Sequence, residues 1–224
     1  MNGKLYLVAT PIGNLEDITI RALNILKEVD IIAAEDTRHT LGLLNHFNIK
    51  KKLISYYREN EKNKSEIILN LLFEGKNVAV VSDAGTPGIS DPGEEIVKEA
   101  IKNSIEIIPI PGACAFINAL ICSGFQSKEF CFIGFLPNSK KEKREKIEEL
   151  KYETKTIILY EAPHRIKETL KEIYGIFGDR KCVLARELTK IHEEFIRDNI
   201  SNIVENDNFR GEFVIIIEGN KISK

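Results

Sequence analysis

The sequence predicts an α/β protein with two domains, each built on a β-sheet that is packed by helices. In the first half, short apolar runs alternate with segments of helical spacing, which is typical of a parallel sheet covered by helices. Loops rich in glycine, proline and acidic residues follow several of these runs. Open α/β sheets bind ligands where loops leave the carboxyl ends of strands, so we expect a binding site there.

The expected elements follow one another without a tandem repeat or a low-complexity linker. In the first half, strands are predicted at residues 5–9, 30–34, 53–56, 78–81 and 105–110, and helices at 19–29, 37–47, 65–74 and 94–102. In the second half, strands are predicted at 130–136, 155–160, 180–185 and 212–217, helices at 115–122, 138–151 and 166–177, and a partly helical segment at 193–205. The predicted domains are residues 1–114 and 115–224.

The composition is that of a globular protein with a sizeable core. Among 224 residues, 43% are hydrophobic and 29% are charged, and the net charge of −2 gives no overall attraction to nucleic acid or anionic membrane. The four cysteines include no C-x-x-C pair, which is typical of free thiols in a reducing compartment. No stretch has the length of a membrane span, and the N-terminal apolar run is interpreted as a strand and not a signal peptide. A cytoplasmic protein is therefore expected.

The loop at residues 82–93 is the feature around which the rest is organised. It follows the apolar run 78–81 and contains three glycines and two prolines. Glycine permits a positive φ and a close approach of the backbone, and proline stiffens the chain. The loop is longer than most strand-to-helix connections, which favours a small-molecule cradle built from main-chain groups. The alternative is a rigid connection that binds no ligand.

Polar side chains follow several predicted strands. They are Glu35, Asp36 and Arg38; Asp83; Glu161, His164 and Arg165; and Arg186 and Glu187. We expect these side chains to lie at a common sheet edge, where open α/β folds bind ligands. Any one of them could instead cap a helix or form a surface pair, as Asp36 or Thr37 could for the helix at 37–47.

Several other kinds of site are not expected. His164 and His192 have no second ligand three or four residues away, so no metal site is predicted. The Walker, standard Rossmann and G-x-S-x-G patterns are absent. Two charged segments could bind nucleic acid or could be solvated surface. They are the highly charged helix predicted at 138–151 and the basic, aromatic patch formed by residues 50–52 and 56–58.

Seven motifs in order carry a resemblance that covers nearly the whole chain. They are LYLVATPIGNL (5–15), AEDTR (34–38), SDAGTPGISDPG (82–93), PG (111–112), YEAPHR (160–165), ARELTKIHEE (185–194) and the segment 210–219. Together they resemble the ribosomal RNA small subunit methyltransferase I family of the tetrapyrrole methylase superfamily, the class III methyltransferases. Many members of that family continue beyond the last strand, whereas this sequence ends at Lys224.

The resemblance implies two α/β domains that hold S-adenosylmethionine in the cleft between them. It implies methyl transfer to a cytidine ribose 2′-hydroxyl of 16S rRNA at the decoding site, with naked rRNA or the assembled small subunit as partner and a homodimer as the assembly. By similarity, the cofactor-binding residues would be Pro11, Asp83, Ala84, Gly85, Ile89, Cys114, Ala115, Tyr160, Glu161, Gly211 and Glu212.

The implied chemistry requires a base and phosphate contacts. A ribose hydroxyl is a poor nucleophile, so a general base should accelerate transfer by about 10²–10⁴-fold. The candidates are Glu187, His164 and Asp36, in that order, and each could instead orient the ribose. Arg38, Arg165 and Arg186 are the candidates for RNA phosphate contacts.

Two other functions remain open at this level. The same fold could methylate a tetrapyrrole or another small molecule, although the motifs at 34–38 and 160–165 favour RNA. A non-enzymatic sensor or scaffold that retains the ligand site is the second alternative.

Overall fold

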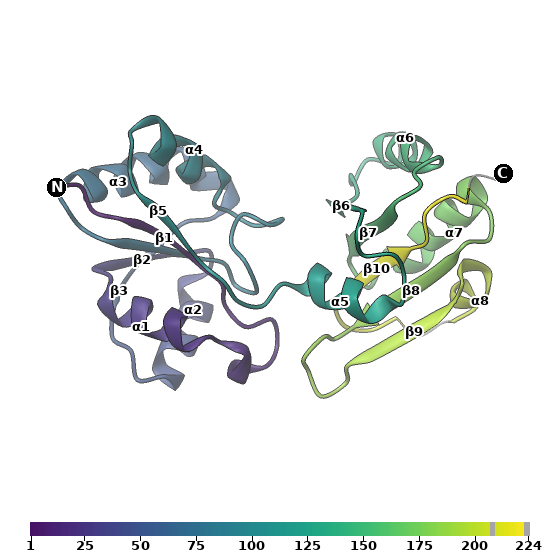
Figure 1. Cartoon of the computed structure of the whole chain (residues 1–224), viewed down its shortest axis with the longest axis horizontal. Helices are drawn as coiled ribbons and strands as arrows, with labels where there is room; N and C mark the ends of the chain where they lie inside the picture. The colour runs from purple at the N-terminus through teal and green to yellow at the C-terminus, as the bar shows by residue number, and fades with distance from the viewer. Residues whose placement is uncertain (207–208, 222–224) are drawn as a thin grey trace. The chain divides into compact units, whose positions relative to one another are not determined.

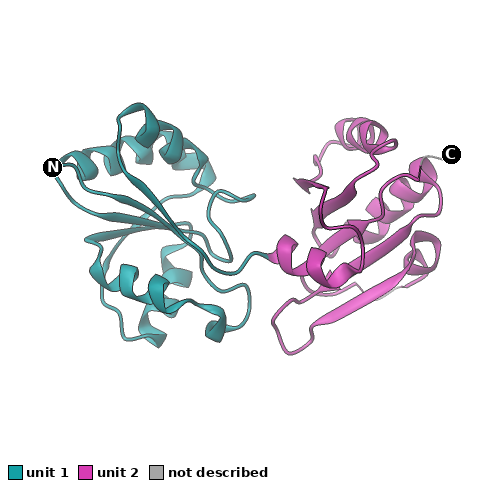
Figure 2. Ribbon diagram, viewed as in Figure 1, with its two compact units in different colours: residues 1–114 teal, residues 115–224 magenta. Residues whose placement is uncertain are grey.

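The structure is a computed structural model that describes residues 1–206 and 209–221. The chain divides into two compact units, Met1–Cys114 and Ala115–Lys224, drawn in teal and magenta in Figure 2. Each unit has its own sheet and its own buried core, which in unit 1 lies on both faces of the sheet, so each is described by itself.

Unit 1 (Met1–Cys114) contains a five-stranded parallel sheet. Its strands are β1 (Leu5–Val8), β2 (Ile31–Ala34), β3 (Lys52–Ser55), β4 (Val78–Val81) and β5 (Ile107–Ile110). The spatial order is β3-β2-β4-β1-β5, and each neighbouring pair is parallel. The carboxyl ends of all five strands therefore lie at one edge of the sheet. This confirms the parallel sheet predicted for the first half.

Helices cover both faces of this sheet. They are α1 (Ile20–Glu28), α2 (Thr37–His46), α3 (Glu61–Phe73) and α4 (Glu94–Lys102), with short 3₁₀ helices η1 (Leu15–Asp17) and η2 (Arg58–Asn60). Val78 and Val80 share one core with α3 and α4, whereas Ala79 and Val81 share the other with α1 and α2. The alternation along β4 places successive side chains on opposite faces, which explains why this strand is apolar throughout. Figure 1 shows the two helix layers on either side of the strands.

Unit 2 (Ala115–Lys224) contains a mixed sheet. Its strands are β6 (Phe130–Phe135), β7 (Thr156–Glu161), β8 (Lys181–Arg186), β9 (Glu194–Asn199) and β10 (Phe213–Ile217). The order is β6-β7-β10-β8-β9; β6 and β7 are parallel, and the other neighbouring pairs are antiparallel. The last strand in the chain thus occupies the middle of the sheet, where all five of its residues are buried.

The helices of unit 2 also lie on two sides. They are α5 (Ala115–Ser123), α6 (Lys140–Leu150), α7 (Ile166–Phe177) and α8 (Ile200–Val204). Residues of α6, α7 and α8 share a core with Ile157 and Leu159 of β7. Helix α5 packs through Phe116, which stacks on Phe132 and donates its amide to the Tyr160 hydroxyl. Tyr160 follows Leu159 directly, so α5 covers the opposite face.

The segment at 193–205 is partly helical, as predicted, but it also contains a strand that the sequence does not predict. Residues Glu194–Asn199 form strand β9, and only Ile200–Val204 is helical. The strand exists because Lys181–Arg186 offers a full edge of backbone donors and acceptors, which pairs with β9 over six residues. Such pairing depends on a distant partner, and the local sequence carries little sign of it.

Candidate functional site

At the carboxyl ends of β1 and β4, the connections that follow two neighbouring strands run toward opposite edges of the sheet of unit 1; we call this place the strand reversal. The connection from β1 leads to β2 on one side, and the connection from β4 leads to β5 on the other. Because β1 and β4 are neighbours, their loops leave in opposite directions from adjacent strand ends. Open α/β sheets bind ligands at such a reversal.

Thr10 and Gly85 join these two loops by their main chains. The Thr10 amide donates to the Gly85 carbonyl at 2.8 Å, and the Gly85 amide donates to the Thr10 carbonyl at 3.1 Å. The buried Thr10 hydroxyl also donates to the Ser82 carbonyl at 3.1 Å. Gly85 has a φ of +87°, and a Cβ added there would lie 3.2 Å from Ile12 Cγ2. The position therefore needs glycine.

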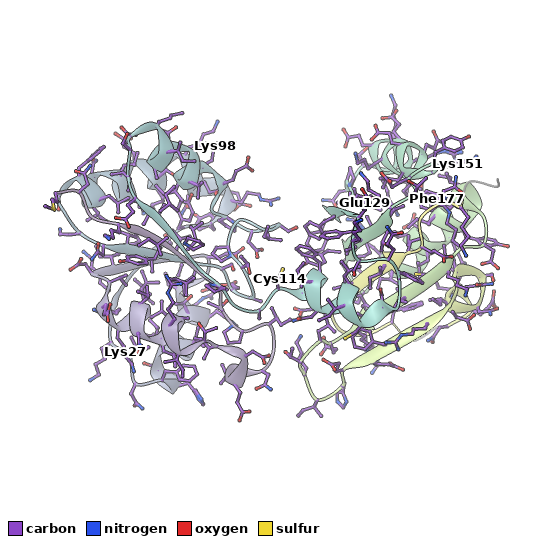
Figure 3. All side chains as sticks on the ribbon, viewed as in Figure 1. Lys27, Lys98, Cys114, Glu129, Lys151 and Phe177 are labelled. Carbon is purple, nitrogen blue, oxygen red and sulfur yellow. The ribbon has the colours of Figure 1, made fainter. Side chains whose placement is uncertain are left out.

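A third loop, which follows β5, lies against the same place. The Thr86 hydroxyl donates to the Ala113 carbonyl at 3.0 Å. A Cβ added at Gly112 would lie 2.8 Å from the Ala9 Cβ, so these two backbones are in close contact. Loops from three adjacent strands thus lie in contact at this edge of the sheet, where the sequence predicts a cradle for a ligand. Of the predicted cofactor-binding residues, Pro11, Asp83, Ala84, Gly85 and Ile89 belong to these loops, and Cys114, labelled in Figure 3, ends unit 1.

Four carboxylates lie around the 82–93 loop. The Asp83 amide donates to Glu35 Oε2 at 3.2 Å, and the Asp36 amide donates to Asp83 Oδ1 at 2.9 Å. Burial raises the pKa of Glu35. Burial, followed by repulsion from Glu35 and Asp83, raises the pKa of Asp91 to about 7, against the opposing effect of Arg58. The region is electronegative and suits a cationic ligand.

Asp36 has the capping role that the sequence left open. Its carboxylate accepts from the Arg38 amide at 2.8 Å at the start of α2 and pairs with the Arg38 guanidinium at 2.6 Å. Hydrogen bonds from Arg38 hold the Asp36 pKa well below its usual range. The Arg38 side chain itself is 90% exposed.

The predicted site residues of unit 2 meet at one edge of its own sheet. Phe213, the first residue of β10, pairs with both Glu161 and Arg186, which end β7 and β8. The register brings together Tyr160, Glu161, Arg186, Glu187, Gly211 and Glu212. The expectation of one common sheet edge for all polar strand ends is wrong, because those of the first and second halves belong to two different sheets.

Glu187 is held as an anion by two groups beside it. Its Oε1 accepts from the Glu212 amide at 2.8 Å and from Lys190 Nζ at 3.1 Å. The amide, followed by the lysine, lowers the Glu187 pKa. Glu187 adopts a φ of +48°, and a Cβ at Gly211 would lie 2.6 Å from its side chain. Gly211 is therefore required for Glu187 to occupy this position.

Arg165 and Arg186 bind neighbouring loops of the protein. Arg165 forms an ion pair with Glu161 at 3.3 Å and donates to the carbonyls of Leu136 and Pro137. Arg186 Nε donates to the Arg210 carbonyl at 2.6 Å, and its guanidinium pairs with Glu194 at 3.2 Å. Sequence reasoning could not detect these internal partners.

His164 is exposed, and Glu161 is buried. Glu161 accepts from the Thr169 hydroxyl at 2.7 Å and from the Ala162 amide at 2.9 Å, and these bonds explain how a carboxylate with only 2% exposure can be buried.

Within residues 1–206 and 209–221, no group of histidine, cysteine or acidic residues could hold a metal ion. In the same residues, no helix combines the length and apolar character needed to span a membrane.

The two sheets and the peptide-lined loops at the strand reversal are those of a class III methyltransferase. The family model of Tetrapyrrole (Corrin/Porphyrin) Methylases matches residues 4–204, so the chain belongs to that family. The uroporphyrin-III C-methyl transferase of Thermus thermophilus, solved with S-adenyl homocysteine, superposes with a TM-score of 0.69 at 16% identity, over 96% of this chain and 97% of that one.

Two sequence relatives define the branch more closely. The ribosomal RNA small subunit methyltransferase I of Halalkalibacterium halodurans is 52% identical over 97% of this chain and 76% of its own length. The protein of the same name from Thermotoga maritima is 48% identical over 97% of this chain and 99% of its own length. The resemblance predicted from the seven motifs is confirmed.

Proposed function

We propose that this protein transfers a methyl group from S-adenosylmethionine to a cytidine ribose 2′-hydroxyl of 16S rRNA, at the decoding site of the small subunit. The observation that supports this most is the identity of 52% and 48% with relatives named ribosomal RNA small subunit methyltransferase I, over 97% of the chain in each case. The proposal includes that the acceptor is the ribose of a cytidine.

The residues of unit 1 fit the proposed cofactor. S-adenosylmethionine supplies, when bound, a methyl group on a cationic sulfonium centre. At Gly85 the main chains of the loops after β1 and β4 lie in direct contact through the pair with Thr10, and the glycine puts no side chain between them. The carboxylates of Glu35, Asp83 and Asp91 favour a positive charge nearby. Their partly buried setting strengthens that attraction over the value it would have in water.

Removal of the hydroxyl proton falls to this chain's own side chains. A general base works best when its pKa lies near the operating pH. Glu187 and Asp36 both have lowered pKa values, so they are weak bases. We therefore expect the exposed His164 to take the proton and Glu187 to orient the ribose by accepting a hydrogen bond. This reverses the order of the first two candidates.

The exposed arginine is the best candidate for a phosphate contact. Arg38 reaches solvent, whereas Arg165 and Arg186 are engaged by carbonyls and carboxylates of the protein. We propose that Arg38 contacts RNA directly and that Arg165 and Arg186 hold loops of unit 2 in place. A phosphate ion pair on Arg38 would compete with Asp36.

The test is methylation of purified small subunits lacking the modification. Mass mapping of ribose methylation, with labelled S-adenosylmethionine, should reveal one labelled cytidine in the presence of the wild-type protein. Asp83→Ala and His164→Ala should each reduce labelling by about 10²-fold or more. Naked 16S rRNA and a uroporphyrinogen serve as alternative acceptors. Label in the tetrapyrrole and none in RNA would refute the proposal.

We further propose that the protein acts in the cytoplasm as a homodimer. Ribosomal subunits are its proposed acceptors, and two copies would join basic patches on a chain whose net charge is only −2. Sedimentation velocity should detect a species of about twice the chain mass of 25.4 kDa. A monomer at micromolar concentration would contradict the dimer.

A further inference from the structure

The 56–65 segment contacts the loop at 82–93 from outside the strand reversal. This segment follows β3, passes through η2 and enters α3. Figure 1 shows α3 beside α4, the helix that the 82–93 loop enters, and both helices share one core. The segment reaches the loop and the start of α4 at three points.

The first contact is made by Arg58 at the middle of the loop. Its guanidinium donates to the Ser90 carbonyl at 3.1 Å. Ser90 has a φ of +65°, a left-handed conformation that a non-glycine residue adopts only when its surroundings fix it. Arg58 also opposes the rise in pKa of Asp91, the next residue.

The second contact fixes the end of the loop. Glu61 Oε1 accepts from the Gly93 amide at 2.8 Å. Gly93 has a φ of +147°, and a Cβ added there would lie 3.1 Å from the Gly88 amide nitrogen. The Gly88 amide in turn donates to the Pro92 carbonyl at 3.1 Å, so the loop folds back on itself at the point that Glu61 holds.

The third contact comes from Tyr56, which is fully buried. Its hydroxyl accepts from the Ile96 amide at 3.2 Å and lies 3.3 Å from both Glu61 Oε1 and Ser65 Oγ. Burial raises the pKa of Tyr56 to about 12, so the phenol stays neutral and can donate to Glu61. Because Tyr56 is buried, it is not part of a nucleic-acid-binding surface in the patch formed by residues 50–52 and 56–58.

These contacts replace a missing helix cap. Gly93 is the N-cap residue of α4 and has no side chain to accept from the first-turn amides. Glu61 accepts from the Gly93 amide, and Tyr56 accepts from the Ile96 amide. The start of the 82–93 loop is fixed by the Thr10–Gly85 pair, and its end by acceptors from the 56–65 segment.

We infer that the 56–65 segment positions the 82–93 loop for cofactor binding, with Tyr56, Arg58 and Glu61 as positioning residues. The inference rests on the proposed function, in which this loop holds the methyl donor. Because both ends of the loop are fixed, its peptide groups keep one arrangement before the cofactor arrives. Preorganisation of this kind raises affinity by reducing the entropy lost on binding.

The test uses Tyr56→Phe, which removes one oxygen atom, and Glu61→Ala. Matched controls are Tyr152→Phe, at a side chain 72% exposed, and Glu66→Ala, at an exposed residue of α3. Calorimetry with S-adenosylhomocysteine should give a dissociation constant about three- to tenfold higher in each test variant, the size of one or two hydrogen bonds. Hydrogen exchange of the Gly93 and Ile96 amides should accelerate by a similar factor, and the controls should match the wild type.

The KM for S-adenosylmethionine should rise in both test variants while kcat on small subunits changes less, which a general loss of folded protein would not produce. Wild-type protein that binds no S-adenosylhomocysteine would overturn the proposed function, and with it this inference. Binding by the wild type together with unchanged affinity and exchange in both variants would overturn the inference alone. Equal acceleration of exchange throughout unit 1 would also overturn it, since the role would then be purely structural.

Discussion

Replacing Asp91 by asparagine should stabilise the protein at neutral pH and leave its stability unchanged near pH 4. The folded state raises the Asp91 pKa from its usual 3.8 to about 7, chiefly by burial and then by repulsion from Glu35 and Asp83. Between these two values the folded protein binds more protons than the unfolded chain, so its stability falls as the pH rises. The loss should be complete above about pH 7, which follows from the same difference in proton binding.

The magnitude follows from that difference in pKa. A pKa difference of about 3 corresponds to about 4 kcal/mol of unfolding free energy, at about 1.4 kcal/mol for each pH unit. Asp91 is only half-buried, and solvent screening reduces this figure to about 2 kcal/mol. Asparagine keeps the size of the side chain and removes the charge, so Asp91→Asn should recover most of that amount above pH 7.

The assay is urea unfolding, followed by circular dichroism, of the wild type and Asp91→Asn at several pH values from about 4 to 8. The difference between the two proteins cancels the titration of other groups. Asp17→Asn, at an exposed carboxylate in η1, is the control and should show no pH-dependent difference. A difference that stays constant across this range, or a wild type that is the more stable protein at pH 8, would refute the electrostatic account of the loop.

Four further outcomes are expected. Gly85→Ala should cost about 1–2 kcal/mol of unfolding free energy, because φ is +87° there and the new Cβ would meet Ile12 at 3.2 Å; urea unfolding measures it. Asp83→Asn should weaken the binding of S-adenosylmethionine more than that of S-adenosylhomocysteine, which lacks the sulfonium charge; equal losses in calorimetry would contradict the charge argument. Thr169→Val should cost about 1–3 kcal/mol by leaving buried Glu161 short of a donor, whereas Thr169→Ser should cost less in thermal unfolding. Lys190→Gln should raise the Glu187 pKa, measured by carbon NMR of its carboxyl group, although the Glu212 amide keeps that pKa below its usual range.

The architecture of unit 1 could be predicted because its signals are local. Apolar runs such as Val78–Val81 are buried on both faces, and the glycines and prolines of the 82–93 loop mark the strand end beside them. Strand β9 could not be predicted in the same way, because Phe195 and Ile196 are only half-buried and its pairing partner lies on another strand. Edge strands depend on backbone partners more than on their own side chains.

The sequence indicates candidate site residues but not their partners. Glu187, Gly211 and Glu212 each belong to a motif, and the register of β10 brings them together. The contact of Lys190 with Glu187 could not be inferred, and it changes the expected chemistry by lowering a pKa. Likewise, nothing in the sequence distinguishes Arg165, which braces a loop, from Arg38, which is exposed. The partner of each charged side chain depends on the tertiary structure and not on the local sequence.

The central position of β10 bears on how the chain folds as it leaves the ribosome. Unit 1 is complete at Cys114 and can fold while the remainder is still being synthesised, as N-terminal domains generally do. Unit 2 cannot, because β10 lies between β7 and β8 in the sheet and is synthesised after both. A nascent chain that stalls before residue 213 would expose two unpaired strand edges, which invite aggregation and engagement by chaperones.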